Sequence, residues 1–242
     1  MNNLELNTIY NESNLQTMAK MPNDFVDYSL TSPPYNVGDN KMFGKETAKY
    51  EGYTDKLDDY FENQKHLINE LLRVTKKHVI YNVQMLGNNK FDFLKLLGFF
   101  SDKIKDIIIW KKNGIPHIEQ GIFNSSFEFI IILSNDRPEK KKFYDANFKQ
   151  GSQNNVFEIL NSHSNPFAKQ HKAIMPLDIP RYFMINFGNV NDIWYDPYMG
   201  TGTTAVAAIE EKKQWVGSEI SNEYVTLANN RLRPYLEQTT LF

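Results

Sequence analysis

"DIWYDPYMGTGTTAVAAIEEKKQWVGSEI", residues 192–220, is the stretch that decides the fold. An apolar run ends at Asp196, Gly200 and Gly202 follow in a turn, a strong helix former covers 203–213, and a second apolar run ends at Glu219. Glycines at a strand-to-helix turn let a ligand approach the backbone closely, and an acid at the end of the next strand can accept hydrogen bonds from both ribose hydroxyls. The stretch predicts a doubly wound α/β fold with a nucleoside site.

The turn differs from the loops that bind dinucleotides or phosphates, because it contains neither GxGxxG nor GxxxxGK[ST]. Asp196 at the strand end suits a cationic group, such as the α-amino group of an amino-acid tail, and it suits pyrophosphate poorly. The alternative interpretation is a tight structural turn without a ligand.

A second unusual stretch is "TSPPYN", residues 31–36, which follows the strand predicted over 25–30. Two successive prolines lack backbone donors and have a fixed φ, so the strand must end there. The stretch therefore predicts a rigid strand end that carries a hydroxyl, an aromatic ring and an amide.

The rest of the chain repeats the alternation of strands and helices. Further strands are predicted over 78–83, 106–110, 127–133, 192–196 and 214–220, and helices over 57–76, 203–213 and 222–236, the last disturbed by Pro234. This alternation predicts a mixed, mostly parallel sheet covered by helices on both faces. The 242 residues suffice for one sizeable domain or two small ones, and we expect a single domain over residues 1–242.

Composition excludes several kinds of chemistry. The 242 residues contain no cysteine, which excludes disulfides, thiolate metal sites and cysteine nucleophiles. The five histidines have no close metal-ligand spacing, so no metal is expected. No apolar run approaches the roughly 20 residues that span a membrane, and the N-terminus lacks a signal-peptide pattern, so a cytoplasmic protein without membrane contact is expected.

Together the two motifs resemble those of DNA amino-methyltransferases that use S-adenosylmethionine. "TSPPYN" is similar to their catalytic motif and "DPYMGTGTT" to their cofactor loop, and "HKAIMP" and "VGSEISNEYVTLANNRL" resemble the segments around that loop. The catalytic motif precedes the cofactor loop by about 165 residues, as in the beta group of the family. The resemblance implies a Rossmann-like methyltransferase fold in a circularly permuted order.

The resemblance also implies the residues of the site. The expected catalytic residues are Ser32, Pro33, Pro34 and Tyr35, and the expected residues that bind S-adenosylmethionine are Thr31, Asp196, Tyr198, Gly200, Gly202, Thr203, Thr204 and Glu219. Tyr198 stands where the family usually has phenylalanine, and Phe127–Glu128 where His-Glu is common.

These residue types suit methylation of a base amine. The lone pair of such an amine is delocalised into the ring, so a site helps by accepting hydrogen bonds from the amine protons and aiming the lone pair at the methyl group. A Pro33–Pro34 carbonyl and the Ser32 hydroxyl are the expected acceptors, and Tyr35 is expected to stack on a base flipped out of the duplex.

Ser32 bears on the target base. In the resembling enzymes, serine before the two prolines mostly accompanies methylation of cytosine N4, and aspartate or asparagine mostly accompanies adenine N6. We therefore expect cytosine N4, with adenine N6 as the alternative. Methylation at cytosine C5 is excluded because it needs a cysteine nucleophile, which the chain lacks.

DNA contacts are expected in the irregular segment of about 135–170, as a short inserted recognition region. Residues 136–172 hold seven basic against four acidic side chains, although the whole chain has a net charge of −2. The expected phosphate contacts are Lys111, Lys112, Arg137, Lys140, Lys141 and Lys142. A second loop, 37–54, could close over the base or the cofactor, with Tyr50 and Tyr53 as stacking groups.

The expected partner is double-stranded DNA. The resemblance implies the modification enzyme of a restriction–modification system, and is compatible with a solitary enzyme, with a homodimer and with a cognate endonuclease that forms no stable complex. Methylation of RNA or of a protein glutamine is disfavoured, because in those enzymes the cofactor loop comes first. A non-catalytic DNA-binding module that retains the fold is the remaining alternative.

Overall fold

The structure is a computed structural model that describes residues 4–36, 59–113, 121, 123, 125–136, 142–160 and 175–239. The predicted loop 37–54, with Tyr50 and Tyr53, lies outside the described residues. In the described part of the chain, no helix combines the length and the hydropathy that crossing a membrane requires.

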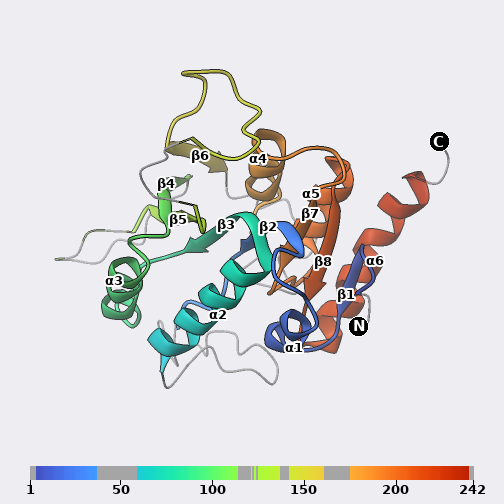
Figure 1. Cartoon of the computed structure of the whole chain (residues 1–242), viewed down its shortest axis with the longest axis horizontal. Coiled ribbons are helices and arrows are strands. Elements are labelled where there is room, and N and C mark those ends of the chain that lie inside the picture. The colour runs from blue at the N-terminus through green and yellow to red at the C-terminus, as the bar shows by residue number, and fades with distance from the viewer. Residues whose placement is uncertain are drawn as a thin grey trace.

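The described chain forms one eight-stranded sheet in the order β1-β8-β7-β2-β3-β5-β4-β6. Figure 1 shows β1 and α6 at the right end of the molecule and β4, β5 and β6 at the left. Among the described strands, β5 alone runs antiparallel to its neighbours, so the predicted mixed, mostly parallel sheet is confirmed. The strands are β1 (Thr8–Tyr10), β2 (Val26–Thr31), β3 (Thr75–Val83), β4 (Ile104–Asn113), β5 (Phe127–Leu133), β6 (Val156–Leu160), β7 (Ile193–Asp196) and β8 (Gln214–Ser218).

The helices of the described chain cover both faces of the sheet, as expected. They are α1 (Asn14–Ala19), α2 (Tyr60–Val74), α3 (Lys90–Phe99), α4 (Asp178–Asn186), α5 (Thr203–Glu210) and α6 (Asn222–Thr239). The first three contribute to one buried cluster and the last three to the other. Alternate strand residues supply the two clusters because successive side chains of a strand point to opposite faces. Trp194, for example, packs with α4 and α5, whereas Tyr195 packs with α1 and α2.

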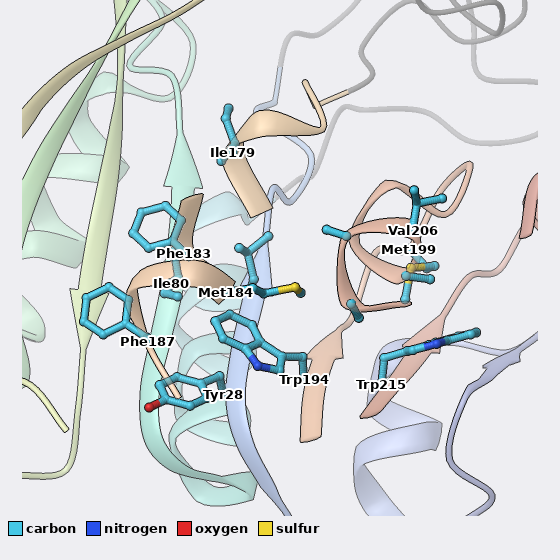
Figure 2. Packing of buried hydrophobic residues seen from close by; sticks show 14 of the residues in the cluster. Tyr28, Ile80, Ile179, Phe183, Met184, Phe187, Trp194, Met199, Val206 and Trp215 are labelled. Carbon is cyan, nitrogen blue, oxygen red and sulfur yellow. The ribbon is translucent and has the colours of Figure 1, made fainter. Parts of the chain in front are cut away.

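The cluster under α4 is rich in aromatic rings. Tyr28 of β2 stacks on Trp194 of β7 with ring centroids 4.6 Å apart, and Phe187 lies 6.5 Å from Tyr28. Figure 2 shows Phe183, Met184 and Phe187 on the side of α4 that faces these strands. This packing holds β2 and β7 together, and these are the two strands that end in the motifs of the sequence.

Helix α6 departs from the prediction, because it continues through Pro234 to Thr239. Proline removes one hydrogen bond and crowds the preceding turn, but it does not always end a helix. Leu232 and Ala228 are fully buried against α5, and this packing stabilises the turns on the N-terminal side of the proline.

The parallel strands bring the motifs to one edge. β7 and β2 are neighbours, yet the helix after β7 leads to β8 on one side and the helix after β2 leads to β3 on the other. Such a reversal leaves a crevice beyond the carboxyl ends of the strands, where open α/β sheets bind their ligands. We call this edge the carboxyl edge, and the opposite one the amino edge.

Candidate functional site

The turn after β7 is built around the Asp196 carboxylate. Asp196 is buried, and it accepts a hydrogen bond from the Tyr198 backbone N–H at 2.9 Å and one from the Thr204 hydroxyl at 2.5 Å. Burial raises the pKa of Asp196 to about 7, against the lowering effect of these two hydrogen bonds. A cation beside this buried carboxyl group would therefore favour its ionised form.

Two glycines allow the turn to pack closely. Gly202 has a φ of +82°, a conformation that favours glycine, and a Cβ at this position would lie 3.2 Å from the Ala228 Cβ of α6. Gly217 of β8 lies under the turn, where a Cβ would approach the Met199 side chain to 2.4 Å. The turn can therefore lie directly on β8 and α6, and the backbone of Gly200 comes close to the end of β8.

Glu219, the residue after β8, is joined to this turn. Its carboxylate accepts hydrogen bonds from the Gly200 N–H at 2.9 Å and from the Ser221 N–H at 2.8 Å. Burial raises its pKa, and the hydrogen bonds oppose that shift. Asn11, which follows β1, donates to the Glu219 carbonyl at 2.9 Å. The ends of β7, β8 and β1 thus form one polar rim.

A second polar group lies at the end of β2. The Ser32 Oγ is 2.7 Å from the Tyr35 hydroxyl, and that hydroxyl donates to the Glu128 carboxylate at 2.9 Å. Asn82 of β3 donates to Glu128 at 2.7 Å and to the Tyr35 oxygen at 2.6 Å. Burial and the charge of Glu128 raise the pKa of Tyr35 well above its ordinary value, so the phenol keeps its proton.

Thr31 ends β2, and the two prolines follow Ser32 directly. Pro33 and Thr31 are buried, and Pro34 and Ser32 are half-buried. The Thr31 hydroxyl is buried without a hydrogen-bond partner among the described residues. Because buried polar groups are normally paired, this hydroxyl retains the capacity for a further hydrogen bond.

Comparisons with known proteins identify the family of this chain. The family model described as DNA methylase, of the N6 and N4 methyltransferases, matches residues 26–230. This chain belongs to the DNA methylase family. It is 27% identical to the orphan methyltransferase M.BamHII of Bacillus amyloliquefaciens, over 87% of this chain and 90% of that protein. It is also 27% identical to the DNA adenine methyltransferase YhdJ of Escherichia coli, over 94% of this chain and 83% of that protein.

Solved structures share the fold of this methylase. The PvuII cytosine-N4-specific DNA methyltransferase has a TM-score of 0.72 at 16% identity, over 93% of this chain and 85% of that one. The complex of M1.HpyAVI with SAM has a TM-score of 0.62 at 20% identity, over 93% of this chain and 99% of that one. The predicted Rossmann-like methyltransferase fold and family are thus confirmed.

The basic residues predicted to contact phosphates lie in different settings in the methylase. Lys111 is exposed and pairs with the exposed Glu158, and Lys112 is half-buried and pairs with the buried Glu128. Lys142 is exposed. Arg137, Lys140 and Lys141 lie outside the described residues. All of these phosphate contacts stay predictions.

Part of the predicted recognition region packs at the amino edge of the methylase. The Tyr144 N–H donates to His78 at 2.9 Å, and Asp145 forms an ion pair of 2.7 Å with Lys77. Both partners lie near the beginning of β3. Tyr144 and Asp145 therefore lie on the side opposite Ser32 and Asp196, and these two contacts are with the fold itself.

From the sequence, Asn82 is not predicted as a site residue and Glu128 has no predicted role. Both are nevertheless polar residues within mostly apolar runs, "HVIYNV" for Asn82 and "FEFIIIL" for Glu128. An amide and a carboxylate inside buried strands need hydrogen-bond partners, but the sequence does not say which residues supply them.

Proposed function

We propose that this DNA methylase transfers a methyl group from S-adenosylmethionine to the N4 amine of a cytosine that is flipped out of double-stranded DNA. The observation that carries the proposal is the meeting of two groups on the neighbouring strands β2 and β7, namely the Ser32 hydroxyl and the buried Asp196 turn. The first suits a base amine and the second a cationic cofactor tail. Names of relatives support a role as the modification enzyme of a restriction–modification system.

The residues of the rim fit the cofactor. The Asp196 carboxylate suits the ammonium of the methionine tail, and the Glu219 oxygens lie at the strand end where ribose hydroxyls bind in doubly wound folds. Gly200 and Gly202 leave the backbone open, and the Thr31 hydroxyl, which has no partner among the described residues, has the capacity for a further hydrogen bond. Tyr198, Thr203 and Thr204 complete the turn. Bound S-adenosylmethionine supplies an electrophilic methyl group on a sulfonium.

The residues after β2 act on the base. The Ser32 oxygen and a carbonyl of the Pro33–Pro34 backbone accept hydrogen bonds from the amine, which directs the lone pair of its nitrogen out of the ring plane. The two prolines keep these acceptors in place without a reorganisation cost. The Tyr35 hydroxyl points into the polar group, and its ring provides a surface on which a flipped base can stack.

Adenine N6 is the second candidate for the target, because YhdJ is a DNA adenine methyltransferase and is similar to this chain over most of its length. Both target amines are exocyclic and conjugated with the ring, so the same acceptors serve either base. Ser32 and the PvuII neighbour favour cytosine. A module that binds DNA without turnover is the third candidate.

The methylated nucleoside distinguishes these candidates. We expect the purified protein, incubated with S-adenosylmethionine and mixed-sequence double-stranded DNA, to yield N4-methylcytosine after digestion to nucleosides and mass spectrometry. N6-methyladenine would establish the second candidate. Absence of any methylated nucleoside, with S-adenosylmethionine binding intact in calorimetry, would support the module without turnover.

Replacing Ser32 with alanine is expected to lower kcat about 100-fold, because the amine then loses a preorganised acceptor. The affinity for S-adenosylmethionine should stay within about twofold of wild type, since Ser32 does not belong to the turn after β7. Single-turnover methylation and titration calorimetry measure the two quantities.

Ser101→Ala, at an exposed turn after α3, is the matched control. Wild-type turnover in Ser32→Ala would refute the role of Ser32.

A further inference from the structure

The polar group at Ser32 extends across four neighbouring strands. Ser32 follows β2, Asn82 is on β3, Glu128 is the second residue of β5 and Lys112 is on β4, in the order in which these strands pair. Glu128 and Asn82 are 6% and 2% exposed. A carboxylate buried to this degree is costly unless charged and polar donors surround it. Here Lys112 pairs with one carboxylate oxygen, and Tyr35 and Asn82 donate to the other.

The carboxylate determines the direction of the hydrogen bonds that lead to Ser32. An ionised carboxylate only accepts hydrogen bonds, so the single Tyr35 proton must be donated to Glu128. With that proton used, the Tyr35 oxygen can only accept. In the contact of 2.7 Å between Ser32 and Tyr35, the serine is therefore the donor.

Asn82 strengthens this direction. Its Nδ2 lies 2.7 Å from the Glu128 carboxylate and 2.6 Å from the Tyr35 oxygen. If the amide were turned by 180°, its oxygen would face the carboxylate oxygen, so the Nδ2 orientation is the one that the contacts permit. Besides its hydrogen bond to Glu128, the amide thus donates one to the Tyr35 oxygen. The Tyr35 oxygen therefore acts as an acceptor toward Asn82 and Ser32, and its proton stays on the side of Glu128.

We propose that Glu128 is a positioning residue that fixes the direction of the Ser32–Tyr35–Glu128 hydrogen bonds, so that Ser32 presents a lone pair to the base. This inference rests on the proposed function and deepens it. A hydroxyl has one proton and two lone pairs. The Ser32 proton is donated to Tyr35, and the Asn82 Nδ2 lies 3.3 Å from the Ser32 oxygen and faces one of its lone pairs. What remains for the substrate is an acceptor, which matches an amine N–H and is mismatched with the carbonyl oxygen of a keto base.

The test uses two substitutions of Glu128. Glu128→Gln removes the charge and supplies a donor, so the direction of the hydrogen bonds is no longer fixed. Glu128→Asp keeps the charge beside Lys112 but shortens the reach to Tyr35. Both are expected to lower kcat about 10- to 100-fold on mixed-sequence DNA, with the affinity for S-adenosylmethionine within about twofold of wild type. Glu210→Gln, at the end of α5, is the matched control.

A double variant and a spectroscopic signal separate this role from a structural one. Tyr35→Phe also frees the Ser32 proton, so Tyr35→Phe combined with Glu128→Gln should lose little more than either change alone. In protein labelled with carbon-13 at the tyrosine ring carbon that bears the hydroxyl, the Tyr35 signal should shift in Glu128→Gln and stay in place in Glu210→Gln.

Each outcome is decisive. Wild-type kcat in both Glu128 variants would overturn the proposal, and so would a parallel loss of cofactor affinity, which would indicate a structural role. If the wild-type protein methylates no DNA, the proposed function fails. The Tyr35 signal still reports the direction in that case, and an unchanged signal in Glu128→Gln would overturn the inference independently of activity.

Discussion

Replacing Asp196 with asparagine is expected to weaken the binding of S-adenosylmethionine about 100-fold. The change removes the charge that compensates the cofactor ammonium, and truncating one partner of a buried, hydrogen-bonded charge pair costs about 2–5 kcal/mol. Asparagine keeps an oxygen for the Tyr198 N–H and a polar group for the Thr204 hydroxyl, so the turn itself should persist. Titration calorimetry of the purified variant measures the loss.

Because of the same carboxylate, the affinity for S-adenosylmethionine is expected to depend on pH. Burial raises the pKa of Asp196 to about 7, so much of the cofactor-free protein carries a neutral Asp196 at pH 6. The wild-type affinity should therefore rise about five- to tenfold between pH 6 and 7.5, as the carboxylate ionises. Above that range the α-amino group of the cofactor begins to lose its own charge. The profile of Asp196→Asn should be flat across the range.

The stability of the cofactor-free protein depends on pH in the opposite sense to its affinity for S-adenosylmethionine. Because the folded-state pKa of Asp196 lies above its ordinary value of 3.8, the folded protein without cofactor binds the proton more tightly than the unfolded chain. Ionisation therefore lowers stability as the pH rises from about 4 to 7, and the bound ammonium offsets that loss.

Thr204→Val is the matched control, because it removes one hydrogen bond from Asp196 and keeps its charge. This bond lowers the pKa of Asp196, so its loss should move the rise in affinity to higher pH and leave a clear pH dependence. Wild-type affinity in Asp196→Asn would refute the assignment of Asp196 to the cofactor tail.

Replacing Lys77 with methionine is expected to lower the free energy of unfolding by about 3 kcal/mol, because it removes the cation that pairs with three carboxylates at the amino edge. The Lys77 ammonium lies 2.7 Å from Asp145, 2.7 Å from Asp192 and 3.3 Å from Asp27, and its side chain is 12% exposed. Burial alone would lower the pKa of Lys77, but its hydrogen bonds to Asp145 and Asp192 raise it overall.

Urea unfolding of wild type and variant at pH 7 measures this change as a shift in the midpoint at constant slope. Lys95→Met removes an exposed cation that pairs with Asp92, and it should change the free energy by less than about 0.5 kcal/mol. A comparably small loss in Lys77→Met would mean that solvent compensates the three carboxylates.

The sequence predicted the strands best where apolar runs were longest. The strand predicted over 127–133 coincides with β5. Among the helices, the one predicted over 203–213 contains α5. The strand β1 has three residues and depends on its parallel pairing with β8, so no local pattern could reveal it. Helix α3 leaves Phe91 and Leu94 exposed, which weakens the periodicity on which a helix prediction depends.

Some residues of the candidate site could be found from the sequence, and others could not. Ser32 and Asp196 could be found from the sequence because each lies in a short motif whose residue types and spacing carry the chemistry. Asn82 and Glu128 lie 50 and 96 positions after Ser32, and they reach it only because β2, β3 and β5 are neighbours in the sheet. Strand order is a property of the whole chain, so short-range spacing does not determine it.

The sequence by itself determined the α/β class, the two motifs, the absence of cysteine chemistry and the family to which the chain belongs. Only the tertiary structure decided how Asp196 is buried, which residues surround the Ser32 hydroxyl, and that Tyr144 and Asp145 pack at the amino edge. The physical reason is that pKa values and hydrogen-bond directions depend on the groups that lie nearby in space, and folding brings those groups together from distant parts of the chain.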